Sequence, residues 1–216
     1  MADASQEGRP YGRYEERLRE VFATACEPLA EEAGAALDPM TVKWFPDRSW
    51  GGRVYVPASG RATAAVTGED GEAVLAEYYG WVSFRRGEEG EEPQDLSAKA
   101  DFTDVTAEEN PDWQIDLNDD VIGDWRTDGG RGGDVTLIWG LPLVRGAVAA
   151  TAELDGETID QGPIADGRFT LLAVDAVHGF GDDLFLEVKL WGRSMKLLAS
   201  ESLYAEADAE PEPGDE

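Results

Sequence analysis

The sequence predicts a mainly β fold (α+β), an antiparallel β-sandwich or barrel with a helical segment at its N-terminus. Near the N-terminus apolar residues recur every three or four positions, whereas from about residue 41 they alternate with polar ones. Clusters of Gly, Pro, Asp and Asn separate the alternating runs, as expected for turns between antiparallel strands. A chain of 216 residues with 7 Trp, 7 Phe and 6 Tyr can bury a core, so we expect one large or two small folded domains.

The helix is expected to begin near Gly12, after a disordered tail over residues 1–11. Pro28 should interrupt it, because proline lacks a backbone N–H and crowds the preceding turn. Cys26 lies next to the apolar face, and we expect a buried thiol rather than a nucleophile, since no second thiol or base lies nearby in sequence. The apolar face is formed by Tyr14, Leu18, Val21, Phe22, Ala25 and Leu29.

The first β region follows Pro39. The long run over residues 74–86 should place Tyr78 and Val82 on one face and Tyr79 and Trp81 on the other. A short acidic turn connects it to the next alternating run, which predicts a β-hairpin. Strands are expected over residues 41–45, 53–57, 61–66, 74–86 and 96–105.

The stretch Asp112–Asp134 carries two tryptophans and many aspartates. We expect a strand through Leu117, a turn at Asn118–Asp120 and a second short strand ending at Trp125. A competing helical register places apolar residues four apart, but Gly123 and the many Asp and Asn residues disfavour a helix. The glycine-rich end of this stretch divides a β region over residues 12–128 from one over residues 129–204, unless the two form one continuous domain.

The C-terminal region predicts a β-meander. The turn HGFGDD is expected to join the third and fourth of its strands, and WGRS the last two. Residues 205–216 are half acidic and contain no base, which predicts a disordered tail. The strands are expected over residues 135–139, 143–154, 168–177, 184–191 and 195–204.

The net charge narrows the classes of partner. With 46 acidic and 18 basic residues the formal net charge is −28, which repels nucleic acid and anionic lipid and attracts basic proteins. The preferred explanation of this acidity is the amino-acid usage of a halophilic or high-GC genome; a functional electrostatic surface is the alternative. No apolar run approaches the roughly 18 residues of a membrane span, so we expect a cytoplasmic protein without membrane contact.

The absence of known catalytic motifs favours a protein that is not an enzyme. The chain has one histidine and one cysteine, which excludes two-histidine and cysteine-cluster metal sites within one chain. His178 lies in a predicted turn, and the sequence contains neither a GxSxG elbow nor a GxxxxGK[ST] loop. The remaining catalytic option is a pair of carboxylates that act as general acid and base, as in glycoside hydrolysis. In a chain with 46 acidic residues such pairs are expected by chance, so they carry little weight.

One metal hypothesis rests on the central stretch. Asp116, Asn118 and Asp120 have the 1-3-5 spacing of a calcium loop, but Val121 and Thr127 stand where the loop requires glycine and glutamate. A looser Ca²⁺ or Mg²⁺ site would use the oxygens of Asp116, Asn118, Asp120 and Asp124. An ordinary polar turn is the preferred interpretation.

The tryptophans suggest a second kind of site. Trp81, Trp113, Trp125 and Trp191 mark a ligand or partner surface if they are exposed, and a core if the sheets close over them. The leading functional hypothesis is a non-enzymatic protein-binding or assembly module, such as an adaptor, an inhibitor or immunity-type protein, or a complex subunit. The alternative is a β-barrel that binds a small apolar or aromatic ligand, with carboxylate-dependent isomerase- or cyclase-like activity.

Overall fold

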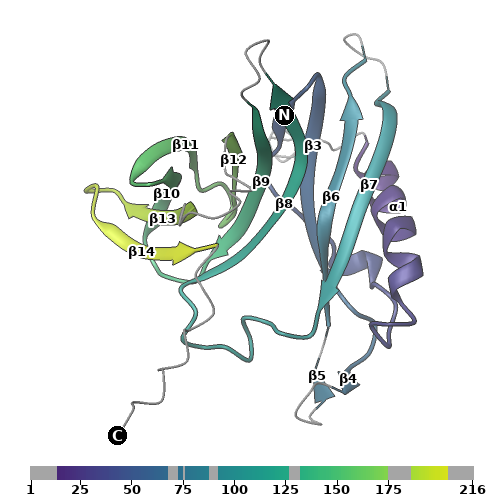
Figure 1. Ribbon diagram of the computed structural model, residues 1–216. Helices are drawn as coiled ribbons and strands as arrows, with labels where there is room; N and C mark the ends of the chain where they lie inside the picture. The colour runs from purple at the N-terminus through teal and green to yellow at the C-terminus, as the bar shows by residue number, and fades with distance from the viewer. Residues whose placement is uncertain are drawn as a thin grey trace, which may run out of the picture.

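In the part of the chain that the structure describes, one helix and three large antiparallel sheets stack in four layers (Figure 1), which confirms the mainly β, sandwich-like fold. The computed structural model describes residues 14–67, 73–74, 76–87, 92–126, 132–174 and 186–203. The two predicted tails and His178 lie outside these residues. No helix among the described residues is long and apolar enough to cross a membrane.

The elements follow one another in this order: α1 (Glu15–Cys26), the 3₁₀ turns Glu27–Leu29 and Pro39–Thr41, β1 (Lys43–Trp44), β2 (Arg48–Trp50), β3 (Arg53–Arg61), β4 (Val66–Thr67), β5 (Ala73–Val74), β6 (Glu77–Arg85), β7 (Gln94–Thr103), β8 (Ile115–Arg126), β9 (Gly132–Pro142), β10 (Ala147–Leu154), β11 (Glu157–Pro163), β12 (Phe169–Val174), β13 (Leu186–Gly192) and β14 (Leu197–Ser202). The short strands β4 and β5 pair with each other, apart from the three large sheets.

Helix α1 covers one face of the first sheet. Its periodic apolar residues Leu18 and Phe22 are fully buried, which confirms the predicted helix and its apolar face. The helix ends at Cys26, and Pro28 lies in the 3₁₀ turn that follows, as the missing N–H of proline requires. Cys26 is 1% exposed, and burial raises the pKa of its thiol to about 12, so this cysteine is a core residue as predicted.

The first sheet has the strand order β1-β3-β6-β7, with β2 also paired to β3. Tyr78 and Val82 of β6 face α1, whereas Tyr79 and Trp81 face the next sheet, which confirms the predicted two faces. The pairing of β6 with β7 confirms the predicted hairpin. The sheet therefore has an apolar core on each side, one shared with the helix and one with the central sheet.

The central sheet, ordered β12-β9-β8, lies between the other two sheets. Every residue of β9 from Val135 to Gly140 is buried. Leu137 and Trp139 pack against the first sheet, and Ile138 packs against the third. β8 and β9 pair along the range Ile115–Pro142, on both sides of the glycine-rich stretch between the two predicted β regions.

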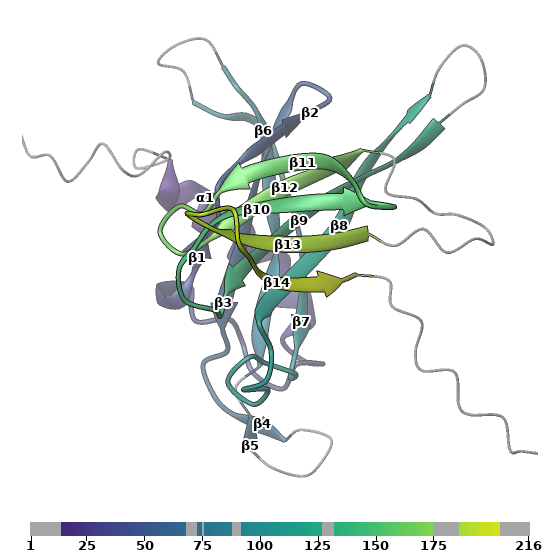
Figure 2. The same ribbon diagram turned by 90° about the vertical axis from the view of Figure 1, so that its left-hand side faces the viewer.

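The third sheet has the order β11-β10-β13-β14 and forms the outer layer seen in front in Figure 2. Its inner face packs on β12, while its outer face carries a hydrogen-bonded polar chain. Trp191 Nε1 donates to Thr151 Oγ1 at 2.9 Å, and the Lys189 ammonium contacts the carboxylates of Glu153 at 2.5 Å and Glu187 at 3.1 Å. Trp191 therefore lies on the outer face of the molecule, far from the helix.

Two predictions about strand connections were wrong. β8 is one continuous strand through Asn118–Asp120, where a turn was predicted; the alternating polar residues follow the pleat, and a β-bulge between Val121 and Gly123 absorbs the irregularity. The C-terminal strands do not form one meander, because β12 pairs with β9 whereas β13 pairs with β10 and β14. The sequence also gave no indication of β11, whose residues Glu157–Pro163 are mostly polar.

Gly80 provides a test of the β6–β7 pairing. Its φ is +152°, and an added Cβ would lie 2.1 Å from the backbone oxygen of Lys99 on β7. We expect Gly80→Ala to lower the free energy of unfolding by about 1–3 kcal/mol through this overlap, in addition to the strain of a positive φ. Gly146, with φ +86° and open space around its Cβ position, is the matched control. Urea denaturation that shows equal losses for Gly80→Ala and Gly146→Ala would contradict the tight contact.

Candidate functional site

A pocket of about 280 Å³ opens at one end of the interface between the first and central sheets. It lies where β3 ends and β6 and β8 begin, in the lower part of Figure 1. Its lining joins charged side chains from both sheets with apolar ones from β9 and the segment after it. The lining residues are Lys43, Arg61, Glu77, Thr106, Ala107, Glu108, Asp116, Leu141 and Leu143.

Strand pairing brings these distant residues together. Arg61 of β3 is directly opposite Glu77 of β6, so both side chains lie on the same face of the first sheet. Asp116 of β8 is opposite Leu141 of β9, on the face of the central sheet that looks toward the first. Each residue stands at the end of its strand, which leaves the pocket open to solvent on one side.

The charged groups of the pocket are only partly paired. The Arg61 guanidinium forms an ion pair with the Glu108 carboxylate. Within the described ranges, Lys43, Glu77 and Asp116 make no side-chain hydrogen bond or ion pair. Burial, helped by the nearby Glu77 carboxylate and opposed by Lys43, raises the pKa of Asp116 to about 6. Asp116 therefore gains or loses a proton close to neutral pH.

Ser59 is a buried polar residue without a partner next to this pocket. It is directly opposite Lys43 in the β1–β3 ladder and opposite Tyr79 in the β3–β6 ladder, on the face that carries Arg61 and Glu77. Ser59 is 3% exposed, and its Oγ has no hydrogen-bond partner among the described residues. Ser59 is not one of the residues that line the pocket, so its hydroxyl is a buried neighbour of the site and not part of its surface.

Exposed apolar side chains lie on the pocket-lining segments or next to them in the sequence: Leu143 lines the pocket, and Val105 precedes the lining residue Thr106. Val105 is 53% exposed, Trp113 38% and Leu143 41%. The backbone of Leu143 donates to Gln114 at 3.0 Å, which places it next to Trp113. Of the four tryptophans singled out from the sequence, Trp113 is the one that these contacts place near the pocket.

Trp81 and Asp120 instead connect the first and central sheets. The indole Nε1 of Trp81 donates to Asp120 Oδ2 at 2.6 Å, and the Lys99 ammonium contacts Asp120 Oδ1 at 2.5 Å. The Trp81 ring meets the Tyr55 ring edge-on at 5.3 Å. The Asp120 carboxylate is therefore satisfied by two donors of the first sheet.

The structure does not gather the four proposed metal ligands at one point. Asp116 and Asp120 share a face of β8 with Asn118 between them, but four residues of extended strand separate their Cα atoms by roughly 13 Å. Asp124 lies beyond the bulge, with its side chain 63% exposed and paired with Arg126 at 3.3 Å. Among the residues that the structure describes, no three Asp, Glu, His or Cys side chains are arranged to hold a metal ion. Trp125, near the end of β8, is half-buried.

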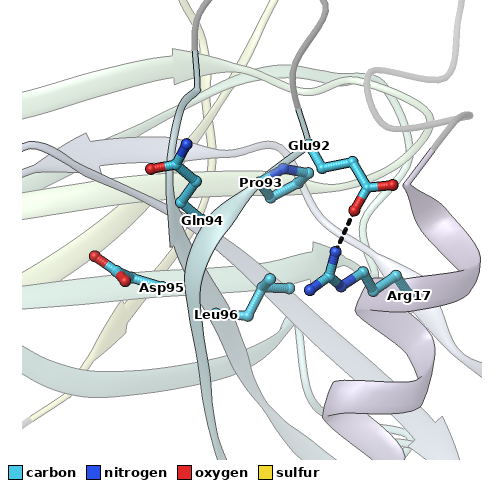
Figure 3. Close-up of a pocket in the computed structure, with 6 residues that line it drawn as sticks. All are labelled: Arg17, Glu92, Pro93, Gln94, Asp95 and Leu96. Carbon is cyan, nitrogen blue, oxygen red and sulfur yellow. Dashed lines mark hydrogen bonds and ion pairs between the residues drawn. The ribbon is translucent and has the colours of Figure 1, made fainter.

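A second hollow, of about 580 Å³, lies between α1 and the start of β7 (Figure 3). The Arg17 guanidinium crosses it to form an ion pair with Glu92. Gln94 and Asp95 point away from this pair in Figure 3, so the polar groups of the hollow do not converge. The pocket at Asp116 is the stronger candidate site for this reason.

Sequence reasoning identified Asp116 and Trp113 but missed Lys43, Ser59, Arg61, Glu77 and Glu108. These residues carry no motif spacing, because they come from different strands and a loop. The one available signal was alternation, which places Glu77 on the same face as Tyr79 and Trp81.

The raised pKa of Asp116 predicts a pH-dependent gain in stability for Asp116→Asn. The folded protein holds this proton up to about pH 6, whereas the unfolded chain releases it near 3.8, so the ionised carboxylate destabilises the fold above pH 6 and not below pH 4. We expect Asp116→Asn to stabilise the protein by about 1–3 kcal/mol at pH 8, with the gain vanishing by pH 4. Thermal unfolding from pH 4 to pH 8 measures it, with the exposed Asp124→Asn as control. A gain independent of pH would contradict this account.

No protein-family model matches this chain, and neither a curated protein sequence nor a solved structure does. The function is therefore inferred from the pocket and its charges.

Proposed function

We propose that this protein is a non-enzymatic protein-binding module whose pocket receives a cationic group from a basic partner. The observation that carries the proposal is a pair of carboxylates, Asp116 and Glu77, that line one pocket from opposite sheets and form no ion pair with any described residue. Because Arg61 and Glu108 neutralise each other, two acids face the single base Lys43. A bound cation would supply the charge that these carboxylates lack.

The charge of the whole chain supports the same kind of partner. A formal net charge of −28 attracts positively charged proteins over long range and increases their rate of encounter, most strongly at low salt. The apolar residues Val105, Trp113 and Leu143 around the pocket add a contact that desolvates on binding. The exposed Trp113 adds to this, because tryptophan is enriched at protein interfaces relative to the rest of the surface.

A second candidate function is carboxylate-dependent acid–base chemistry on a small ligand with an apolar part. The observation that favours it is the Asp116 pKa of about 6, since general acids and bases work best when their pKa is close to the ambient pH. Leu141 and Leu143 would contact the apolar part of such a ligand. This candidate predicts turnover of a ligand, whereas the binding module predicts association alone.

Binding of a lysine- and arginine-rich peptide tests the main proposal. We expect wild type to bind the peptide, and Asp116→Asn and Glu77→Gln each to weaken the affinity by about tenfold or more, because each removes a partly buried charge partner. Affinity should also fall below about pH 6, where Asp116 becomes protonated.

Fluorescence anisotropy at fixed ionic strength measures both effects. The matched control is Asp124→Asn, which removes one negative charge from an exposed site on β8 and should leave the affinity within about twofold of wild type. If Asp124→Asn and Asp116→Asn weaken the affinity equally, the effect comes from net charge alone, and the pocket is not the binding site.

A further inference from the structure

We infer that the pocket recognises the N-terminal residue of a peptide, by its α-ammonium group together with its neighbouring carbonyl oxygen. This inference rests on the proposed function and specifies which cationic group enters the pocket. It follows from the presence of a cation, Lys43, in the same pocket as the two acids Asp116 and Glu77.

The two acids suit an ammonium group. Asp116 comes from the central sheet and Glu77 from the first, so their carboxylates approach the pocket from different sides. An α-ammonium group has three N–H donors and needs more than one acceptor when it leaves water. Two acids from opposite walls supply these acceptors, and neither is occupied by a neighbour within the described part of the chain.

Lys43 distinguishes an N-terminus from a lysine or arginine side chain. A lysine side chain would bring a second cation close to Lys43 and carries no oxygen next to its ammonium group that Lys43 could donate to. An N-terminal residue carries a carbonyl oxygen next to its α-carbon, which can accept from the Lys43 ammonium while the amine meets the acids. The combination of two acids and a base in one pocket matches the amine and carbonyl of one residue.

The size and apolar lining of the pocket fit one residue with an apolar side chain. Its volume of about 280 Å³ is below the roughly 300–1,000 Å³ of pockets for drug-sized ligands. Ala107, Leu141 and Leu143 give it an apolar wall. Leu143, which is 41% exposed, lies at the surface of this wall, where the following residues of a peptide would contact it.

Isothermal titration calorimetry with the full chain tests the inference with matched probes. These are leucyl-alanyl-glycinamide, its N-acetylated form, N-acetyl-lysyl-alanyl-glycinamide and free leucine. We expect the free-amine peptide to bind, acetylation to weaken binding by about tenfold or more, and Asp116→Asn to weaken it similarly.

The four probes separate failure of the inference from failure of the proposed function. If the acetylated lysine peptide binds as tightly as the free-amine peptide and depends on Asp116, the cation pocket stands and the N-terminal inference is overturned. Free leucine binding as tightly as the peptide would identify an amino-acid site and also overturn it. If none of the probes binds, the inference and the proposed cation pocket are both overturned.

The pH profile and Lys43 give two independent readouts. Affinity for the free-amine peptide should fall above about pH 8, where an α-amine loses its proton, whereas a lysine side chain stays charged to about pH 10. Lys43→Met should weaken the peptide and strengthen n-butylamine, a cation without a carbonyl group. Lys196→Met, at an exposed position in the β13–β14 turn, is the matched control and should change neither. If Lys43→Met strengthens both ligands, Lys43 does not contact the carbonyl and the inference fails.

Discussion

The burial of β9 on both faces is the constraint on which the other layers depend. Successive side chains of a strand point to opposite sides, so Leu137 and Trp139 complete one core while Ile138 completes the other. At Gly140 an added Cβ would lie 2.4 Å from the backbone oxygen of Asp116, which shows how closely β8 packs against β9 there. A change in register of β9 would exchange the two sets of side chains and disturb both interfaces together. The order of the layers therefore follows from one strand of mainly apolar residues.

The same face of β8 carries two carboxylates in opposite conditions. Asp120 accepts from Trp81 and Lys99 and stabilises the packing of the two sheets. Asp116, four residues earlier on the same strand, forms no hydrogen bond or ion pair with the described residues. The difference arises from the first sheet, which presents donors opposite Asp120 and a second acid, Glu77, near Asp116. A carboxylate in a partly buried, acidic environment lowers the stability of the fold, and proteins retain such groups mainly at functional sites. This contrast within one strand is the physical basis for choosing Asp116 over the other acids of the stretch.

Periodicity in the sequence was sufficient to predict α1, the two faces of β6 and the β6–β7 hairpin, because each depends on residues close together in the chain. It was not sufficient for β8, where the many Asp and Asn residues suggested a turn but instead alternate along a strand that faces polar partners. It also failed for β12, since nothing local distinguishes a strand that pairs with β9 from one that pairs with β13. Of the residues that line the pocket, the sequence singled out Asp116 alone, because Lys43, Glu77 and Glu108 reach the pocket through pairings and loops between distant segments.

The burial of Cys26 makes the labelling rate of its thiol a measure of local opening. Its thiol, on the last residue of α1, is buried in the core between the helix and the first sheet; burial raises its pKa to about 12, so the folded protein holds almost no thiolate, the species that reacts with alkylating reagents. Because the chain contains no other cysteine, every labelled molecule must have passed through a conformation in which at least the C-terminal end of α1 has moved away from the first sheet. The rate of labelling under native conditions thus reports the opening of this one interface. The native cysteine therefore reports the opening of the helix–sheet interface, and no probe has to be introduced.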